Sequence, residues 1–219
     1  MNDFSIIIPV FNEDKNLNSL IKEIIISLKN YKDNFEIILI DDGSTDETIS
    51  TINSLIDKYP LLLKLISNKK NLGQSFSIIK GIQESSFDVI VTIDGDGQNN
   101  PQDIKLLLDH FFSNQDIFLV GGIRKNRKDN LLKIISSIIA NYIRNLFLND
   151  NCKDTGCSLK VFDKNLFMKF PFFNGIHRFL PALFSSYGKK TLFINVDHRP
   201  RIHGYSKYDT LGRLIRGIR

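Results

Sequence analysis

Short apolar runs alternate with amphipathic stretches along the first half of this chain. Each run is bounded by turn residues and has the length of a buried strand. The stretches between the runs place apolar residues at three- and four-residue spacing, which is typical of helices that pack one face against a core. Such alternation predicts βαβ units, and hence an α/β fold with a mostly parallel sheet and helices on both faces. The expected strands are residues 4–10, 35–40, 61–66, 87–93 and 117–120.

The expected helices start near residues that can cap a helix, or at a proline. Three start near Asp14, Ser44 and Asn71, and a fourth spans residues 101–112. A chain of 219 residues with 42% hydrophobic content can bury one sizeable core. We therefore expect a single domain over residues 1–219.

The character of the chain changes after Gly122. A basic loop at 124–128 leads into a helix candidate over 130–147, which has one broad apolar face. That face could lie on a membrane or pack against the sheet, and the sequence leaves both open. An apolar run at 159–162 and a strand at 191–196 are expected further on.

The net charge of +5 hides an uneven distribution of charge. Residues 1–123 hold ten Lys and Arg against eighteen Asp and Glu, whereas residues 124–219 hold nineteen against six. A basic half is typical of proteins that meet nucleic acid, anionic lipid or phosphorylated ligands, although it can also be plain surface charge. The chain carries no RNA-binding aromatic signature and no recognition-helix pattern, so we do not expect a nucleic-acid partner.

The chain shows no sign of export or of a membrane span. Its first residues begin a strand directly, without the basic and apolar regions of a secretory signal. No stretch of 18 residues lacks charge, so no spanning helix is expected. Cys152 and Cys157 share a short loop without histidine at ligand spacing, which argues against a disulfide framework or a zinc site. We expect a cytoplasmic protein that binds peripherally to the inner face of the membrane.

Acidic residues follow three of the expected strands. Glu13 follows the first strand, Asp41 and Asp42 end the second, and the fourth leads into Asp94-Gly95-Asp96-Gly97-Gln98. Ligands of doubly wound sheets bind beyond the carboxyl ends of the strands, so these groups should converge. Asp94 and Asp96 would repel one another unless a cation lay between them, and Mg²⁺ or Mn²⁺ prefers such oxygen ligands.

Each acidic group also has a plain structural explanation. Asp94 and Asp96 could belong to a solvated turn, and Asp41 and Asp42 could cap the helix that follows them. Together with Glu13, the latter pair could instead accept hydrogen bonds from ribose hydroxyls and base N–H groups.

Six segments together resemble one known family. They are similar to family 2 glycosyltransferases of the dolichyl-phosphate mannose synthase and bacterial polyprenyl-phosphate glycosyltransferase type. The resemblance implies a GT-A fold and nucleotide-sugar chemistry. Gly95 stands where many relatives have alanine, and both residues are small. The segments are SIIIPVFNE, IILIDDGSTDET, NKKNLGQSFSIIKGI, VTIDGDGQNNP, DTGCSLKVF and HRPRIHGYSKY.

The resemblance also implies roles for individual residues. Asp94, Asp96 and Gln98 would hold the metal and the donor diphosphate, with Asp96 central to catalysis. The residues implied to hold the nucleoside are Pro9, Glu13, Asp41 and Asp42, with Gly73 at the border of the same pocket.

Asp154 lies close to the position of a general base in many inverting relatives. An acceptor phosphate monoester, with a second pKa of about 6, is already ionised at neutral pH and scarcely needs a base. Asp154 could therefore orient the acceptor, or it could be an ordinary turn aspartate.

Basic residues of the second half form a candidate phosphate clamp. Guanidinium groups pair bidentately with phosphate oxygens, although a solvated basic loop would have the same composition. Arg124, with its basic neighbours, could also attract an anionic membrane surface. The candidates are Arg124, Arg178, Arg199, Arg201, Ser206 and Lys207.

The expected function is the inverting transfer of a hexose-type sugar to a polyprenyl phosphate. The donor would be similar to GDP-mannose or UDP-glucose, held by residues 1–123, and the acceptor and membrane would meet residues 124–219. The alternative acceptor is a saccharide or protein hydroxyl, for which Asp154 must act as a true base. A phosphoacceptor receiver module is disfavoured because Val10, Phe11 and Asn12 stand where it needs an acidic pair. The oligomeric state is not predicted.

Overall fold

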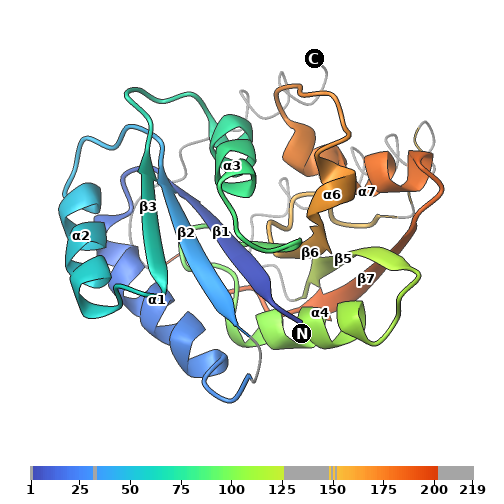
Figure 1. The fold of residues 1–219 in the computed structure, drawn as a ribbon, viewed down its shortest axis with the longest axis horizontal. Coiled ribbons are helices and arrows are strands. Elements are labelled where there is room, and N and C mark those ends of the chain that lie inside the picture. The colour runs from blue at the N-terminus through green and yellow to red at the C-terminus, as the bar shows by residue number, and fades with distance from the viewer. Residues whose placement is uncertain (1, 32–33, 126–147, 149, 151, 202–219) are drawn as a thin grey trace.

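The computed structural model describes residues 2–31, 34–125, 148, 150 and 152–201 (Figure 1). Their strands form one seven-stranded sheet in the order β3-β2-β1-β4-β6-β5-β7. Only β6 runs antiparallel to its neighbours, β4 and β5. The strands are β1 (Phe4–Val10), β2 (Phe35–Asp41), β3 (Leu63–Ser67), β4 (Val89–Thr92), β5 (Ile117–Arg124), β6 (Lys160–Asp163) and β7 (Lys190–Val196).

Helices cover both faces of this sheet. Successive residues of a strand point to opposite faces, and β1 accordingly sends Ile6 and Ile8 into one core and Ile7 into the other. The first core is completed by α1, α2 and α4, and the second by α3, α6 and α7. The helices are α1 (Asp14–Ser27), α2 (Thr48–Lys58), α3 (Gln74–Gln83), α4 (Gln102–Phe112), α6 (Lys164–Phe167) and α7 (Ile176–Ser186).

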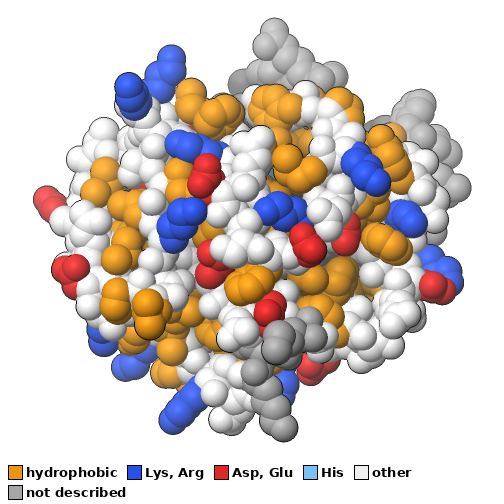
Figure 2. All heavy atoms as spheres, viewed as in Figure 1, with side chains coloured by type: hydrophobic (Ala, Val, Ile, Leu, Met, Phe, Trp, Pro, Cys, Tyr) orange, Lys and Arg blue, Asp and Glu red, His pale blue; other side chains and the backbone are white. Residues whose placement is uncertain are grey.

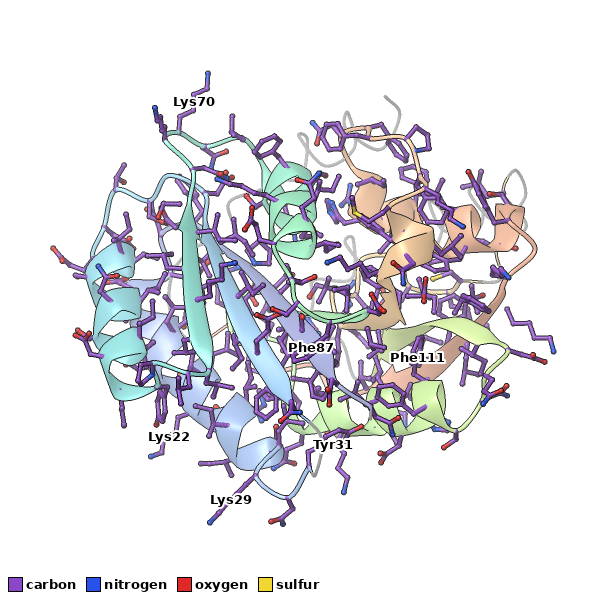
Figure 3. The ribbon with its side chains drawn as sticks, viewed as in Figure 1. Lys22, Lys29, Tyr31, Lys70, Phe87 and Phe111 are labelled. Atoms are coloured by element: carbon purple, nitrogen blue, oxygen red, sulfur yellow. The ribbon has the colours of Figure 1, made fainter. Side chains whose placement is uncertain are left out.

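The amphipathic pattern of the helices accounts for their placement. In α1, Leu17, Ile21 and Ile24 are fully buried against the sheet. Lys22 of the same helix and Lys29 just after it point away from the protein body (Figure 3). The α/β fold with a mostly parallel sheet, expected from the alternation of apolar runs and amphipathic stretches, is confirmed.

Two helices begin later than the cap-type residues predict. Helix α2 starts at Thr48 rather than near Ser44, because the loop before it is bound to the loop after β1, with the Thr45 amide donating to Asn12 Oδ1 at 2.8 Å. Helix α3 starts at Gln74 rather than near Asn71, because Gly73 has a φ of +94°, which a right-handed helix cannot contain. A contact between two loops and one glycine therefore delay the two helix starts.

One strand starts later than expected, and one expected helix lies outside the described residues. Strand β3 starts at Leu63, two residues later than expected, because residues 60–62 form a turn. The helix candidate over 130–147 lies outside the described residues. Within the described part of the chain, none of the helices combines the length and the apolar character that crossing a bilayer requires.

Candidate functional site

Three loops meet where β1, β2 and β4 end. These strands are parallel neighbours, with Val10 paired to Asp41 in the register of β1 and β2. Their carboxyl ends therefore lie at one edge of the sheet, as expected. Around α3, close to this edge, acidic and basic side chains lie near one another on the face shown in Figure 2.

Asp41 and Asp42 bind the backbone of the surrounding loops. Asp41 is fully buried and accepts hydrogen bonds from the amides of Gly43 (3.3 Å) and Ser44 (3.2 Å). Asp42 accepts from the amides of Leu72 (2.9 Å) and Gly73 (2.8 Å). The two carboxylates thus shape the loops at the sheet edge, and their contacts with a nucleoside stay a prediction.

Gly43 lets these loops approach one another closely. Its φ of +76° lies in the left-handed region, which side chains disfavour. A Cβ atom on it would lie 2.7 Å from the carbonyl carbon of Lys70 and 2.8 Å from the amide nitrogen of Asn71. Lys70 itself points outward at the tip of this loop (Figure 3).

Asp94 and Asp96 follow β4 and interact electrostatically. Asp94 accepts a hydrogen bond from Gln74 Nε2 at 2.7 Å, and its amide donates to Ser158 Oγ at 3.2 Å. Desolvation, followed by the negative charge of Asp96, raises the pKa of Asp94 to about 6. Asp96 accepts from the Gln98 amide at 3.1 Å. A bound cation would stabilise the ionised form of Asp94 beside the charge of Asp96.

Arg201 joins the acidic groups of two loops. Its Nη2 donates to Asp96 Oδ2 at 2.6 Å, and its Nη1 lies 3.5 Å from Glu13 Oε1. Glu13 is buried and also accepts from Asn16 Nδ2 at 2.6 Å. The structure therefore brings together three residues that the sequence assigned to the nucleotide, the metal and the phosphate.

The donor chemistry of this edge fits a divalent cation that is shared with a ligand. Among the residues that the structure describes, no group of three or more His, Cys, Asp or Glu could hold a metal alone. Asp94 and Asp96 offer carboxylate oxygens, the ligands that Mg²⁺ and Mn²⁺ prefer. Mg²⁺ is usually held by one or two carboxylates together with substrate phosphates and water, which matches this incomplete set.

Asp154 and Arg124 bind each other. Asp154 is buried and accepts from the Arg124 amide at 3.1 Å, from its Nε at 2.8 Å and from its Nη2 at 2.7 Å. Arg124 ends β5, so this pair fixes the loop before β6 to the end of a neighbouring strand. The sequence singled out both residues but did not predict their pairing.

Lys160 is a residue of this region that the sequence analysis missed. It is buried, and its Nζ donates to the carbonyl of Cys157. Burial lowers its pKa, while Cys157, Asp154 and Asp94 act in the opposite direction. A lysine inside the apolar run at 159–162 was the signal that could have identified it, because a buried cation needs partners.

The remaining candidate phosphate residues have other surroundings than Arg201, or lie beyond the described chain. The Arg199 side chain donates to Glu23 Oε2 at 2.5 Å and to Asn100 Oδ1 at 2.7 Å, and so links α1 to the loop after β4. Its backbone borders the predicted metal loop, since the Arg199 amide donates to the Gln98 carbonyl at 2.8 Å. Arg178 is exposed in the first turn of α7, and Ser206 and Lys207 lie outside the described residues. Among the candidates that the structure describes, Arg201 is the one whose guanidinium pairs with a predicted metal carboxylate.

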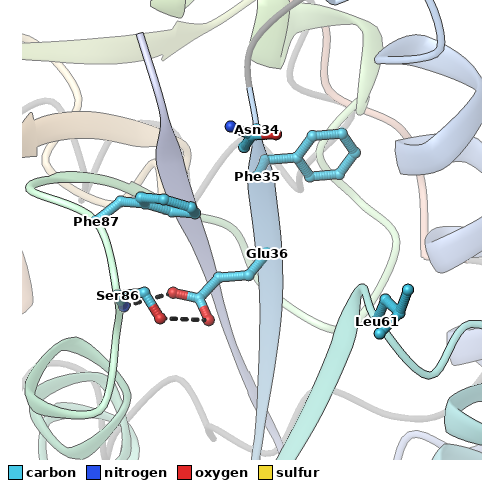
Figure 4. Close-up of a pocket in the computed structure, with 6 residues that line it drawn as sticks. All are labelled: Asn34, Phe35, Glu36, Leu61, Ser86 and Phe87. Atoms are coloured by element: carbon cyan, nitrogen blue, oxygen red, sulfur yellow. Dashed lines mark hydrogen bonds between the residues drawn. The ribbon is translucent and has the colours of Figure 1, made fainter. Parts of the chain in front are cut away.

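A shallow hollow of about 470 Å³ lies at the opposite edge of the sheet (Figure 4). Glu36 accepts there from the Ser86 amide at 2.5 Å and from Ser5 Oγ at 2.7 Å, so its carboxylate ties strand ends together. None of the predicted site residues lines this hollow. Size alone therefore does not identify the site. The lining residues are Asn34, Phe35, Glu36, Leu61, Ser86 and Phe87.

Comparisons with known proteins agree with the motifs. The family model described as "Glycosyl transferase family 2" matches residues 5–172. Dodecaprenyl-phosphate galacturonate synthase of Rhizobium johnstonii is 32% identical over 209 residues, which cover 94% of this chain and 62% of that protein. Undecaprenyl-phosphate 4-deoxy-4-formamido-L-arabinose transferase of Pectobacterium carotovorum is 29% identical, over 96% of this chain and 64% of that protein. The chain thus spans less than two thirds of these relatives.

A solved structure shares the fold. Glucosyl-3-phosphoglycerate synthase from Mycobacterium tuberculosis, in complex with Mn²⁺, UDP and glucosyl-3-phosphoglycerate, superposes with a TM-score of 0.74. The match covers 98% of this chain and 75% of that chain, at 18% sequence identity. An identity this low shows the common fold alone, and the expected GT-A type of fold is thereby confirmed.

Proposed function

Because this chain belongs to glycosyltransferase family 2, we propose that it moves a hexose-type sugar from a nucleotide-sugar to a polyprenyl phosphate with inversion. The observation that carries the proposal is the meeting of Glu13, Asp96 and Arg201 at one edge of the sheet. Carboxylates for a cation and a guanidinium for a phosphate lie there within hydrogen-bonding reach. A diphosphate-linked substrate needs both kinds of group.

The donor would lie across the ends of β1, β2 and β4. Asp94, Asp96 and Gln98 would hold Mg²⁺ or Mn²⁺, which supplies stabilisation of the charge on the departing diphosphate when it is bound. Arg201 already lies against Asp96, so its guanidinium could exchange that carboxylate for diphosphate oxygens. The nucleoside would lie against Pro9, Glu13, Asp41, Asp42 and Gly73.

The contacts of Asp154 favour a phosphate acceptor over a hydroxyl acceptor. Both of its carboxylate oxygens accept hydrogen bonds from Arg124, so taking a proton from a hydroxyl would disrupt a charge-assisted pair. A phosphate monoester is largely ionised at neutral pH, so Asp154 need not remove a proton from it. In this proposal Asp154 orients Arg124 towards the acceptor, with Arg178, Arg199, Ser206 and Lys207 as further candidate contacts. The phosphate then attacks the anomeric carbon in a single displacement.

The names of two relatives also support a lipid-linked acceptor. They refer to dodecaprenyl phosphate and undecaprenyl phosphate, which are membrane lipids. We therefore include in the proposal that the protein works at the inner face of the cytoplasmic membrane. The basic residues that follow Arg124, up to position 128, would add attraction to an anionic surface, on the order of 1 kcal/mol for each residue near it. Arg124 itself is paired with Asp154.

Organic extraction tests the proposed acceptor. The protein is incubated with Mn²⁺ and either labelled UDP-glucose or labelled GDP-mannose, together with undecaprenyl phosphate. Label should pass into the organic phase, and should stay aqueous when undecaprenol replaces the phosphate or when EDTA removes the metal. Label that enters a water-soluble saccharide or protein instead would establish the alternative, a hydroxyl acceptor with Asp154 as base.

A further inference from the structure

A small cavity lies between the end of β4 and the first turns of α3 and α7. It measures about 10 Å³, which is room for one water molecule or one hydroxyl oxygen. Its apolar lining includes Ile78 and Leu180, and its polar lining consists of Gln74, Thr92, Asp94, Ser158, Lys160 and His177. The cavity therefore borders the carboxylate that the proposed function gives to the metal.

His177 is held in this cavity by a buried serine. Ser75 is 2% exposed, and its Oγ lies 2.9 Å from His177 Nδ1. The Gly175 amide donates to the same Oγ at 2.8 Å, so the hydroxyl proton is free to point elsewhere. The alternative acceptor, Asn174 Oδ1, is 3.5 Å away, which is long for a hydroxyl hydrogen bond. The hydrogen bond between Ser75 Oγ and Nδ1 can run in either direction, and in both cases Nδ1 is occupied while Nε2 is left for another partner.

The ring stays neutral at physiological pH. Burial, together with the positive charges of Lys160 and Arg178, lowers the pKa of His177 to about 3. Nε2 makes no hydrogen bond to any part of the chain that the structure describes. The neutral ring of His177, held at Nδ1 by Ser75, thus lines a space of hydroxyl size.

We propose that Nε2 of His177 faces this cavity and recognises one hydroxyl of the transferred sugar, which enters the cavity and forms a hydrogen bond with Nε2. This assignment rests on the proposed function, since it needs a nucleotide-sugar beside Asp94. Ser75 is the positioning residue that fixes the ring. The volume admits a hydroxyl and excludes an N-acyl or carboxylate substituent at the same sugar position. The cavity would therefore select sugars by the substituent at one carbon.

Deoxy analogues test the assignment by direct binding. Calorimetry in the presence of Mn²⁺ compares UDP-glucose and GDP-mannose with their analogues that lack a single hydroxyl. In the wild-type protein one deoxy position should weaken binding about tenfold, because the analogue leaves a buried polar group of the site unpaired. In His177→Ala that penalty should shrink to within about twofold, while binding of UDP or GDP alone stays unchanged. His110→Ala, an exposed histidine on α4, is the matched control.

The outcomes separate this assignment from the proposed function. An unchanged deoxy penalty in His177→Ala, with the parent sugar still bound and transferred, overturns the role of His177 alone. A wild-type protein that binds no nucleotide-sugar overturns the proposed function and this assignment with it. His177→Asn keeps an amide at the place of Nδ1, near Ser75, and has no group at the place of Nε2, so it provides the same comparison should His177→Ala be unfolded at the assay temperature. Ser75→Ala should reduce the deoxy penalty partly, because the ring is then free to turn.

Discussion

Asp96 is a proposed metal ligand and also pairs with Arg201, a proposed phosphate ligand. We expect Asp96→Asn to lower turnover by at least about a hundredfold, since a neutral amide holds a divalent cation less tightly than a carboxylate does. The fold should persist, because the new side chain can still accept from the Gln98 amide. Steady-state turnover and thermal melting measure the two effects. Asp109→Asn, an exposed aspartate on α4, serves as the control. Near-normal turnover of Asp96→Asn would contradict the metal assignment.

The ion pair between Asp154 and Arg124 has a structural role that can be measured apart from activity. We expect Asp154→Ala to lower the free energy of unfolding by about 3 kcal/mol, because it leaves a largely buried guanidinium without its carboxylate. Chemical denaturation gives this value. Asp116→Ala breaks the exposed pair with Lys190 and should cost less than about 1 kcal/mol. If Asp154→Ala lowered the free energy of unfolding no more than Asp116→Ala does, the pair of Asp154 and Arg124 would not stabilise the fold.

At the residue scale, the sequence located the site better than it located the contacts within it. The acidic residues after β1 and β4 could be assigned to one edge because parallel strands share a direction. The pairing of Arg124 with Asp154 could not be predicted, since neither spacing nor residue type specifies which cation meets which carboxylate. His177 and Lys160 were missed as lining residues because their positions depend on how α7 and β6 pack against β4.

Helix α3 carries Gln74 and Ser75 into the site, and its distance from the sheet is set by Gly81. A Cβ atom at this position would lie 2.6 Å from Ile40 Cδ1 and 2.8 Å from Ile7 Cγ2. We expect Gly81→Ala to lower the free energy of unfolding by about 1–2 kcal/mol, because overpacking outweighs the gain in helix propensity. Urea denaturation checks the value. Ser54→Ala, exposed on α2, should be neutral or slightly stabilising.

The elements themselves were largely predictable, and the exceptions have physical causes. Apolar runs identified β1 to β5 and β7, and the apolar run at 159–162 coincides with most of β6. Amphipathic spacing identified the first four helices, with later starts for α2 and α3. The orientation of β6 was not predictable, because a run of four residues carries no direction and its partners β4 and β5 lie far away in the chain. The helix starts shifted where the Thr45 amide binds Asn12 and where Gly73 takes a positive φ.

Ionisation of Asp94 should lower the free energy of unfolding of the whole molecule. Its pKa is raised from 3.8 to about 6 in the folded protein, so the folded state binds this proton more tightly than the unfolded state. The stabilising effect of protonated Asp94 is therefore fully present below about pH 4 and is lost as the pH rises towards 6. We expect Asp94→Asn to raise the melting temperature of the metal-free protein at pH 7.5 and to leave it little changed at pH 4.

The stabilisation by Mn²⁺ should rise with pH, whereas the stabilisation by protonated Asp94 falls. Mn²⁺ needs the ionised carboxylate, so its stabilisation of the wild-type protein should fall as the pH is lowered through about 6. Thermal melting with Mn²⁺ and with EDTA, across this range, gives the dependence. Asp94→Asn should show no Mn²⁺-dependent increase in melting temperature at any pH. A full increase in that variant would place the ion elsewhere.

The position of β6 in the sheet has a consequence for how the protein is made. During synthesis β5 leaves the ribosome before β6, the strand that must stand between it and β4. Until then β4 has an open edge, and β5 cannot join the strands already formed. The nascent chain therefore passes through a partly assembled state in which the exposed edge of β4 can pair with other chains. Chaperones that shield such edges should raise the yield of native protein.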